Sequence, residues 1–130
     1  PKGYEPPLKI VDKAREIDND IDLVITDDFD KALNGTHVLY TDVWSSMGQE
    51  NEKDSKDIKF KGYTLTLDML KKVKSNAIVM HCLPAYRGKE IMEDVFESSQ
   101  SRIFLQAENR MHAQQALLCY LLDKNLHEFQ

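Results

Sequence analysis

Asp42 is the first residue whose type and position could do chemistry, because it lies at the end of the apolar run 37–40. A carboxylate at that point can bind an ammonium group, or it can cap a turn with its short side chain. Ser46 adds a hydroxyl group nearby, and Met47 adds a thioether that more often packs than recognises a ligand. Gly48 follows, so this stretch is equally typical of a glycine-containing turn.

A second group of reactive side chains follows the apolar run 77–80, in the string His81-Cys82-Leu83-Pro84. Cys82 is either a reactive thiol or substrate contact, or a simply buried cysteine. A cis bond before Pro84 would expose the carbonyl group of Leu83. Neighbouring strand residues face opposite sides, so His81 and Cys82 would need a bend to bind one ion. We therefore predict no metal site.

Arg110 is the third candidate, within the string Glu108-Asn109-Arg110-Met111-His112 near the start of a predicted last helix. A helix N-terminus favours anions, and a guanidinium group there adds donors for a phosphate or a polarised carbonyl. The alternative is a surface salt bridge with Glu108. The spacing alone leaves both interpretations open.

The elements that must position these residues alternate between helical and extended patterns. Apolar periodicity predicts helices at 10–17, 29–33, 67–73 and 91–96, and a long helix after residue 106. Short apolar runs predict strands at 23–25, 37–40, 77–80 and 102–106. Segment 45–59 has no periodicity and is typical of a charged, solvated loop. The last helix is expected to bury one apolar stripe, formed by Ala113, Ala116, Leu117, Tyr120 and Leu121.

This alternation predicts an α/β fold, with an open parallel sheet flanked by helices in a Rossmann-like, three-layer arrangement. The continuous apolar run 77–80 is expected to be covered on both faces. Ligands of open α/β sheets bind beyond the carboxyl ends of the strands. Asp42, His81 and Cys82 collect at those ends, so we expect the functional site along that edge.

Composition excludes several classes of function. The chain has 22 acidic and 17 basic residues and a net charge of −5, without a basic cluster, so we expect no nucleic-acid partner. The longest apolar run is far shorter than the roughly 20 residues of a membrane span, so we expect no membrane partner. The glycines do not form a dinucleotide or phosphate-binding loop, and we expect no cofactor. Two cysteines without a disulfide framework favour a reducing compartment.

Three sequence motifs are considered together with their order and their separations along the chain. They are Thr41-Asp42-Val43-Trp44-Ser45-Ser46-Met47-Gly48-Gln49-Glu50, His81-Cys82-Leu83-Pro84-Ala85 and Ala107-Glu108-Asn109-Arg110. Together they resemble the ornithine carbamoyltransferases of the aspartate/ornithine carbamoyltransferase superfamily. The resemblance covers essentially the whole chain. It implies that residues 1–130 are the C-terminal, L-ornithine-binding domain of a two-domain enzyme, without the first strand of that domain and without the whole carbamoyl phosphate domain.

The resemblance implies transfer of the carbamoyl group of carbamoyl phosphate to the δ-amine of L-ornithine, which gives L-citrulline and phosphate. Asp42 would hold the α-ammonium group of ornithine. Ser46 and Met47 would help to seat its amino-acid end. Cys82 would lie beside the attacking δ-amine.

The same resemblance assigns the carbamoyl side of the reaction. Leu83 would contact the carbamoyl group through its backbone, and Arg110 would polarise the carbonyl oxygen of that group. Cys82 and Arg110 are thus the implied catalytic residues. His81 is a further candidate contact at the carbamoyl end.

The resemblance also implies a biological setting. We expect a homotrimer of the full-length enzyme in the cytoplasm, acting in arginine biosynthesis, with the mitochondrial matrix as the alternative if the source is an animal. We expect this chain alone to be inactive. The alternative functions are a carbamoyltransferase for another amine such as putrescine and a non-catalytic amino-acid-binding α/β module.

Overall fold

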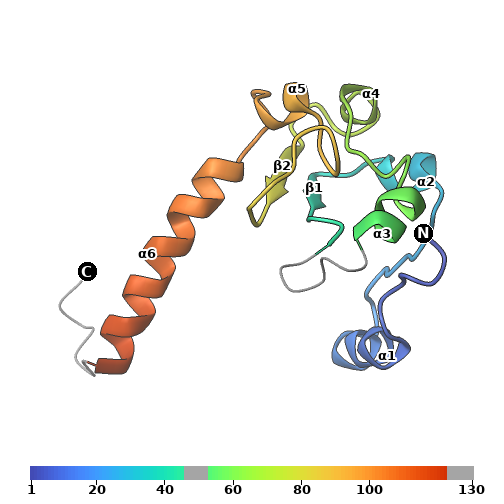
Figure 1. Cartoon of the computed structure of the whole chain (residues 1–130). Helices are drawn as coiled ribbons and strands as arrows, with labels where there is room; N and C mark the ends of the chain where they lie inside the picture. Colours follow the sequence, from blue (N-terminus) through green and yellow to red (C-terminus); the bar gives the residue numbers. More distant parts are fainter. Residues whose placement is uncertain (46–52, 123–130) are drawn as a thin grey trace.

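The computed structural model describes residues 1–45 and 53–122 (Figure 1). Short helices and two strands alternate before one long final helix. In chain order they are α1 (Leu8–Ile17), α2 (Phe29–Leu33), β1 (Val38–Thr41), α3 (Lys53–Lys59), α4 (Leu67–Leu70), β2 (Ile78–His81), α5 (Glu93–Phe96) and α6 (Ile103–Leu122). Among the described residues, no helix is both long and apolar enough to cross a membrane.

The two strands lie side by side and run in the same direction. β1 and β2 pair in parallel, with Val38 opposite Ile78 and Thr41 opposite His81. This confirms the predicted α/β class with a parallel sheet. The expectation that both faces of β2 are covered is wrong, because Val79 and His81 are buried while Ile78 and Met80, on the opposite face, are half-buried. Within the described chain, helices cover one face of this strand more completely than the other.

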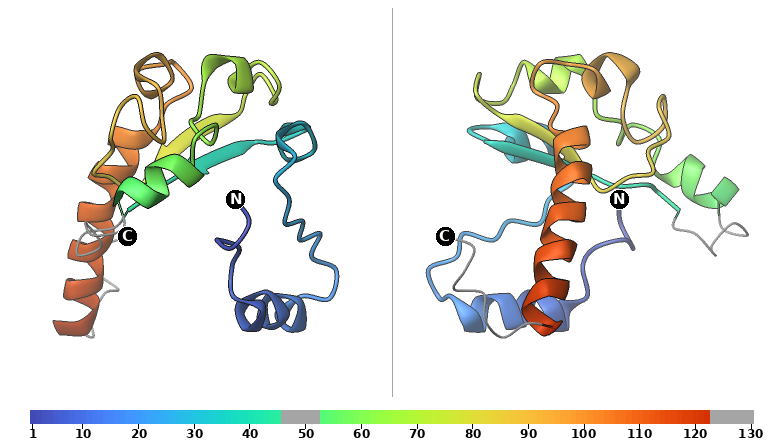
Figure 2. Two further views of the ribbon diagram at one scale, coloured as in Figure 1. Left: turned by 45° about the vertical axis from the view of Figure 1, so that its right-hand side comes forward. Right: turned by 90° about the vertical axis from the view of Figure 1, so that its left-hand side faces the viewer.

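The hydrophobic core lies where β2 meets α4, α5 and the beginning of α6. Figures 1 and 2 show α4 and α5 together on the same side of the sheet, and α6 packs against β2. The core residues are Leu65, Leu70, Val79, Ile91, Val95, Phe96 and Ile103. At roughly 25 cal/mol per Å² of apolar surface, burial of these side chains is the main stabilising contribution. The core therefore packs against β2 and against the beginning of α6.

Local sequence signals explain the short helices. The Asp28 side chain accepts hydrogen bonds from the backbone N–H groups of Asp30 and Lys31, which caps the N-terminus of α2. Gly35 follows the end of α2 with a φ of +76°, a conformation that glycine adopts without strain. The Thr66 side chain caps α4 in the same way as Asp28 caps α2. The predicted helices at 10–17, 29–33, 67–73 and 91–96 are thus confirmed, with α4 and α5 shorter than expected.

Two of the predicted strands are wrong. Segment 23–25 is extended but pairs with no strand of the described chain, and Val24 and Ile25 are about half exposed. An apolar run becomes a strand only when a partner edge accepts its hydrogen bonds. In the predicted strand 102–106, residues 103–106 belong to α6, and the preceding Ser101 makes an isolated parallel bridge to Val79. Leu105, Gln106, Ala107 and Glu108 are strong helix formers, and neither glycine nor proline interrupts the sequence after Arg102, so the segment is helical.

The predicted apolar stripe of the last helix is also exposed. The side chains of Leu117, Tyr120 and Leu121 are more than half exposed, and Ile103 is the buried residue of α6. Figures 1 and 2 show the helix extending away from the sheet, so the described chain offers this stripe no surface to pack against. The predicted loop 45–59 needs a correction as well, because residues 53–59 form α3.

The core assignment leads to a stability prediction. Replacing Ile91, whose side chain is fully buried, with alanine should lower the free energy of unfolding by about 2–5 kcal/mol. The matched control is Leu121→Ala on the exposed face of α6, which should change it by less than about 0.5 kcal/mol. Urea unfolding followed by circular dichroism measures both. Equal effects of the two substitutions would contradict this placement of the core.

Candidate active site

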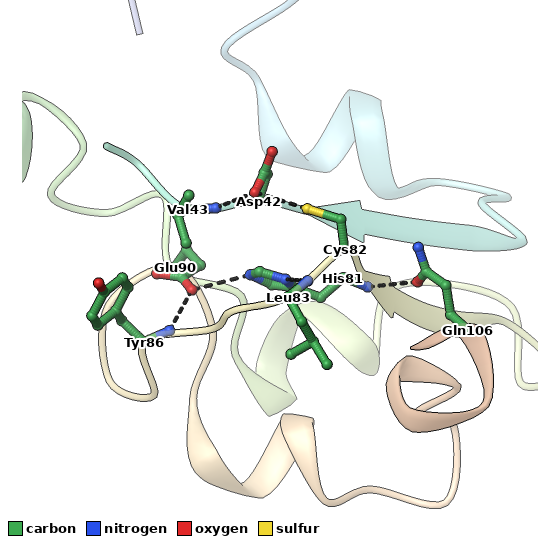
Figure 3. Close-up of polar contacts among 8 residues, drawn as sticks. All are labelled: Asp42, Val43, His81, Cys82, Leu83, Tyr86, Glu90 and Gln106. Atoms are coloured by element: carbon green, nitrogen blue, oxygen red, sulfur yellow. Dashed lines mark hydrogen bonds and ion pairs between the residues drawn. The ribbon is translucent and has the colours of Figure 1, made fainter. Parts of the chain in front are cut away.

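The parallel register brings Asp42 and Cys82 together, because each follows the last residue of a paired strand. The Cys82 thiol donates a hydrogen bond to Oδ1 of Asp42 over 3.0 Å. The backbone N–H of Val43 donates to the same oxygen over 2.7 Å (Figure 3). Asp42 is exposed and Cys82 is half-buried, so the carboxylate stays open to solvent while the thiol lies partly beneath it. The expected convergence at the strand ends is therefore observed for this pair.

The Asp42 carboxylate favours the protonated form of the Cys82 thiol. Asp42 raises the pKa of Cys82, first by accepting the hydrogen bond of the neutral thiol, with smaller contributions from burial and from the negative charge of Asp42. A thiolate would lose that bond and would face a like charge. Cys82 therefore acts in this site as a neutral hydrogen-bond donor and not as an activated nucleophile.

Arg110 joins the site from α6. Its Nη1 group donates a hydrogen bond to the carbonyl oxygen of Cys82 over 3.2 Å. The expectation that Arg110 lies at a helix N-terminus is wrong, because α6 begins at Ile103 and places it about two turns inside the helix. Glu108 pairs with His112 over 3.7 Å. The contact with Cys82, and not the helix terminus, thus places the guanidinium group near the strand ends.

Gln106 connects the helix to both strands one turn before Arg110. Its Nε2 group donates to Oη of Tyr40 on β1 over 2.8 Å, and its Oε1 accepts from the backbone N–H of His81 on β2 over 3.1 Å. Residues four apart lie on the same face of a helix. The side chain that fixes α6 against the sheet therefore shares a face with the arginine that reaches Cys82.

The backbone after β2 turns sharply at Leu83. Leu83 has a φ of 57°, and the peptide bond between Leu83 and Pro84 is cis, as the sequence allowed. The backbone N–H of Leu83 donates to Nδ1 of His81 over 2.8 Å. The fully buried His81 ring also reaches Oε1 of Glu90 through its Nε2 over 3.1 Å. Both ring nitrogens of His81 are thus already bonded inside the protein (Figure 3).

The turn also affects the earlier argument about metals. Ligand atoms of Asp42, His81 and Cys82 lie within 4.8 Å of one another, so the bend that the sequence argument required is present. The bonded nitrogens of His81 and the protonated thiol of Cys82 leave this group poorly suited to bind a cation. The absence of a metal cofactor remains a prediction.

Sequence reasoning missed two members of this arrangement. Glu90 is fully buried and Gln106 is half-buried, and neither follows an apolar strand or stands in a recognisable motif. A buried glutamate has no periodic signature, because its position depends on partners that only the fold brings near. The predicted contacts Ser46 and Met47 lie outside the described residues.

Comparisons with known proteins identify the family of this chain. Residues 1–121 match the profile of a family described as aspartate/ornithine carbamoyltransferase, Asp/Orn binding domain. The chain is 58% identical over 123 residues to the ornithine carbamoyltransferase of Prochlorococcus marinus subsp. pastoris. It is 50% identical over 123 residues to the enzyme of that name from Nostoc sp.. Each match covers 94% of this chain and 40% of the relative.

Solved structures give the same result. The anabolic ornithine carbamoyltransferase of Campylobacter jejuni matches with a TM-score of 0.83 and 36% identity, over 96% of this chain and 42% of that one. The ornithine carbamoyltransferase of Pyrococcus furiosus matches with a TM-score of 0.81 and 40% identity, over 92% of this chain and 39% of that one. The chain therefore spans about 40% of the length of its relatives. It belongs to the aspartate/ornithine carbamoyltransferase family.

The contact between Asp42 and Cys82 predicts the reactivity of the thiol. Asp42→Ala removes both the hydrogen-bond acceptor and the negative charge that oppose ionisation of the thiol, so the pKa of Cys82 should fall and its thiolate should form at lower pH. Alkylation of Cys82 by iodoacetamide should then become several-fold faster just above neutral pH, as measured by mass spectrometry of the labelled peptides. The exposed Cys119 in the same molecule is the internal control and should react at an unchanged rate. A Cys82 rate that stays the same in the variant would contradict the assigned cause.

Proposed function

We propose that the polypeptide that carries this chain is an ornithine carbamoyltransferase, and that the chain supplies the ornithine side of its active site. The proposal starts from membership of the family and from relatives that bear this name. The observation that carries it is the continuous hydrogen-bonded series from Asp42 through Cys82 to Arg110 at the carboxyl ends of two parallel strands. The resemblance of the sequence to this family implies that these residues contact ornithine and the carbamoyl group.

Asp42 supports the amino-acid end of this proposal. Its Oδ1 accepts two hydrogen bonds, from the thiol of Cys82 and the backbone of Val43, which fix the orientation of the carboxylate. The residue is nevertheless exposed, so a substrate ammonium group can approach it. A charge-assisted hydrogen bond from an α-ammonium group is roughly twice as strong as a neutral one. Ser46 and Met47 remain predicted neighbours of the same end of ornithine.

Cys82, Leu83 and Arg110 support the transfer step. The neutral δ-amine attacks the carbonyl carbon of carbamoyl phosphate and forms a tetrahedral species, whose collapse breaks the bond to phosphate and leaves citrulline after loss of a proton. The negative charge that develops on the carbonyl oxygen needs fixed donors. Arg110 uses one N–H for the Cys82 carbonyl and has further donors for that oxygen. Contacts from the Leu83 backbone and the thiol of Cys82 hold the reactants together.

This chain carries only part of the proposed site. It spans about 40% of its relatives, and the residues that grip the phosphate of carbamoyl phosphate are expected in a separate domain. We therefore propose that turnover requires the complete polypeptide. Because a Campylobacter jejuni relative is described as anabolic, we further propose a role in arginine biosynthesis, in the cytoplasm.

The proposed function predicts a specific loss in the complete polypeptide. Asp42→Asn should lower kcat/KM for ornithine about 10- to 150-fold, because the loss of a hydrogen bond to a charged group costs about 1.5–3 kcal/mol. The measurement is citrulline formed from ornithine and carbamoyl phosphate. The matched control is Asp68→Asn, which removes an exposed carboxylate paired with Lys71 and should leave turnover unchanged.

The same assay separates the alternatives. Wild-type protein that carbamoylates putrescine or aspartate in preference to ornithine would contradict the proposed substrate. Wild-type protein that binds ornithine in calorimetry without any turnover would identify a binding module instead.

The assembly of the complete polypeptide is a separate prediction. We propose a homotrimer, as the resemblance to this family implies. Size-exclusion chromatography with light scattering should give a mass of three full-length chains. A monomeric mass at micromolar concentration would contradict the proposal without affecting the assignment of the site.

A further inference from the structure

Glu90 is a fully buried carboxylate outside the proposed set of substrate contacts. Removing a charged group from water is unfavourable unless hydrogen bonds replace its solvation. Glu90 receives two: Oε1 accepts from the backbone N–H of Tyr86 over 2.6 Å and from Nε2 of His81 over 3.1 Å. Its other oxygen, Oε2, is buried and accepts no hydrogen bond from the described residues. One oxygen therefore makes both contacts.

The partners of Glu90 determine the state of His81. Nδ1 of His81 accepts a hydrogen bond from the backbone N–H of Leu83, so it carries no proton. Nε2 must then carry the proton and donate it to Glu90. The ring is a neutral imidazole held in one tautomer by a carboxylate on one side and a backbone amide on the other. Glu90 thus acts on Leu83 through His81.

The segment that these bonds hold is the turn after β2. Leu83 is the residue other than glycine that has a positive φ among those the structure describes, and a left-handed conformation is unfavourable for a leucine. The hydrogen bond to His81 compensates for this conformation at Leu83, and the hydrogen bond to Tyr86 closes the turn on its far side. Figure 3 shows the hydrogen bonds from His81 and from the backbone of Tyr86 meeting at one oxygen of Glu90.

We propose that Glu90 is a positioning residue for the carbamoyl transfer, an inference that rests on the proposed function. By fixing the tautomer of His81 and the turn from Leu83 to Tyr86, it holds the Leu83 backbone and the Cys82 carbonyl where the substrate and Arg110 require them. Glu90 acts through the position of its Oε1 atom, which accepts both hydrogen bonds, and not through its negative charge. A neutral side chain of the same length with an oxygen at that position should therefore replace it.

Three substitutions in the complete polypeptide distinguish the position of the acceptor oxygen from the negative charge and from the volume of the side chain. Glu90→Gln keeps an acceptor oxygen at the same distance, so kcat should stay within about 3-fold of wild type. Glu90→Asp keeps the charge but is one methylene shorter, and Glu90→Met fills the space without an acceptor. Both should lower kcat roughly 10- to 100-fold, because small displacements of reacting groups have effects of that size.

Kinetic parameters distinguish positioning from general damage. KM for ornithine should change less than kcat in Glu90→Asp, because Asp42 follows the other strand and lies outside this turn. If Glu90→Met does not fold, comparison of Glu90→Gln with Glu90→Asp still distinguishes the position of the acceptor oxygen from the negative charge. An Asp variant more active than the Gln variant would show that charge matters, and equal activity of all three would show that Glu90 only fills space. Either result overturns the proposal.

A second measurement is independent of turnover. Release of the turn should loosen the contact between Cys82 and Asp42, so iodoacetamide should alkylate Cys82 several-fold faster in Glu90→Asp than in Glu90→Gln or wild type. Alkylation of Cys119 is the internal control. If wild type makes no citrulline, the proposed function fails, and these rates still show whether Glu90 holds the turn. Equal Cys82 rates in Glu90→Asp and wild type would overturn the role of Glu90.

Discussion

The parallel pairing of β1 with β2 is the constraint on which the site depends. Parallel strands end at the same edge of a sheet, and the register that sets Thr41 opposite His81 makes Asp42 and Cys82 neighbours. A shift of one residue would turn every following side chain to the other face and separate the carboxylate from the thiol. Because the neighbouring carboxylate raises the pKa of the Cys82 thiol, the register also sets the electrostatics of the site.

This constraint explains which parts of the site could be predicted. Apolar runs at 37–40 and 77–80 are strong local signals, and their ends identify Asp42 and Cys82 without any knowledge of the fold. Arg110 came from a motif, and its contact with Cys82 depends on α6 starting at Ile103. The sequence argument expected a strand before that helix. The structure places Arg110 beside Cys82, although the helix that carries it begins earlier than predicted and its role in the site stays a prediction.

The remaining errors have a common physical origin. The spacing of apolar residues indicates which face of a segment could be buried. Burial itself also requires a second surface for that face to pack against. Segment 23–25 has the composition of a strand but no edge to pair with in the described chain. The apolar stripe of α6 has the periodicity of a packed helix and stays exposed for the same reason. Glu90 is the converse case. Glutamate is usually exposed, but Glu90 is buried with hydrogen-bond partners that the local sequence does not predict.

Polar side chains outside the strands fix the strand ends, the turn after β2 and the last helix. Gln106 bonds to the N–H of His81 and to the Tyr40 hydroxyl, while Glu90 bonds to the N–H of Tyr86. A two-stranded sheet is marginal by itself and leaves such backbone groups without ladder partners. Side chains from α6 and from the loop before α5 satisfy these groups and connect each element to the strand ends. The side chains of Gln106 and Glu90 therefore stabilise the end of the sheet and also determine the geometry of the site, so a change to either residue affects stability and geometry together.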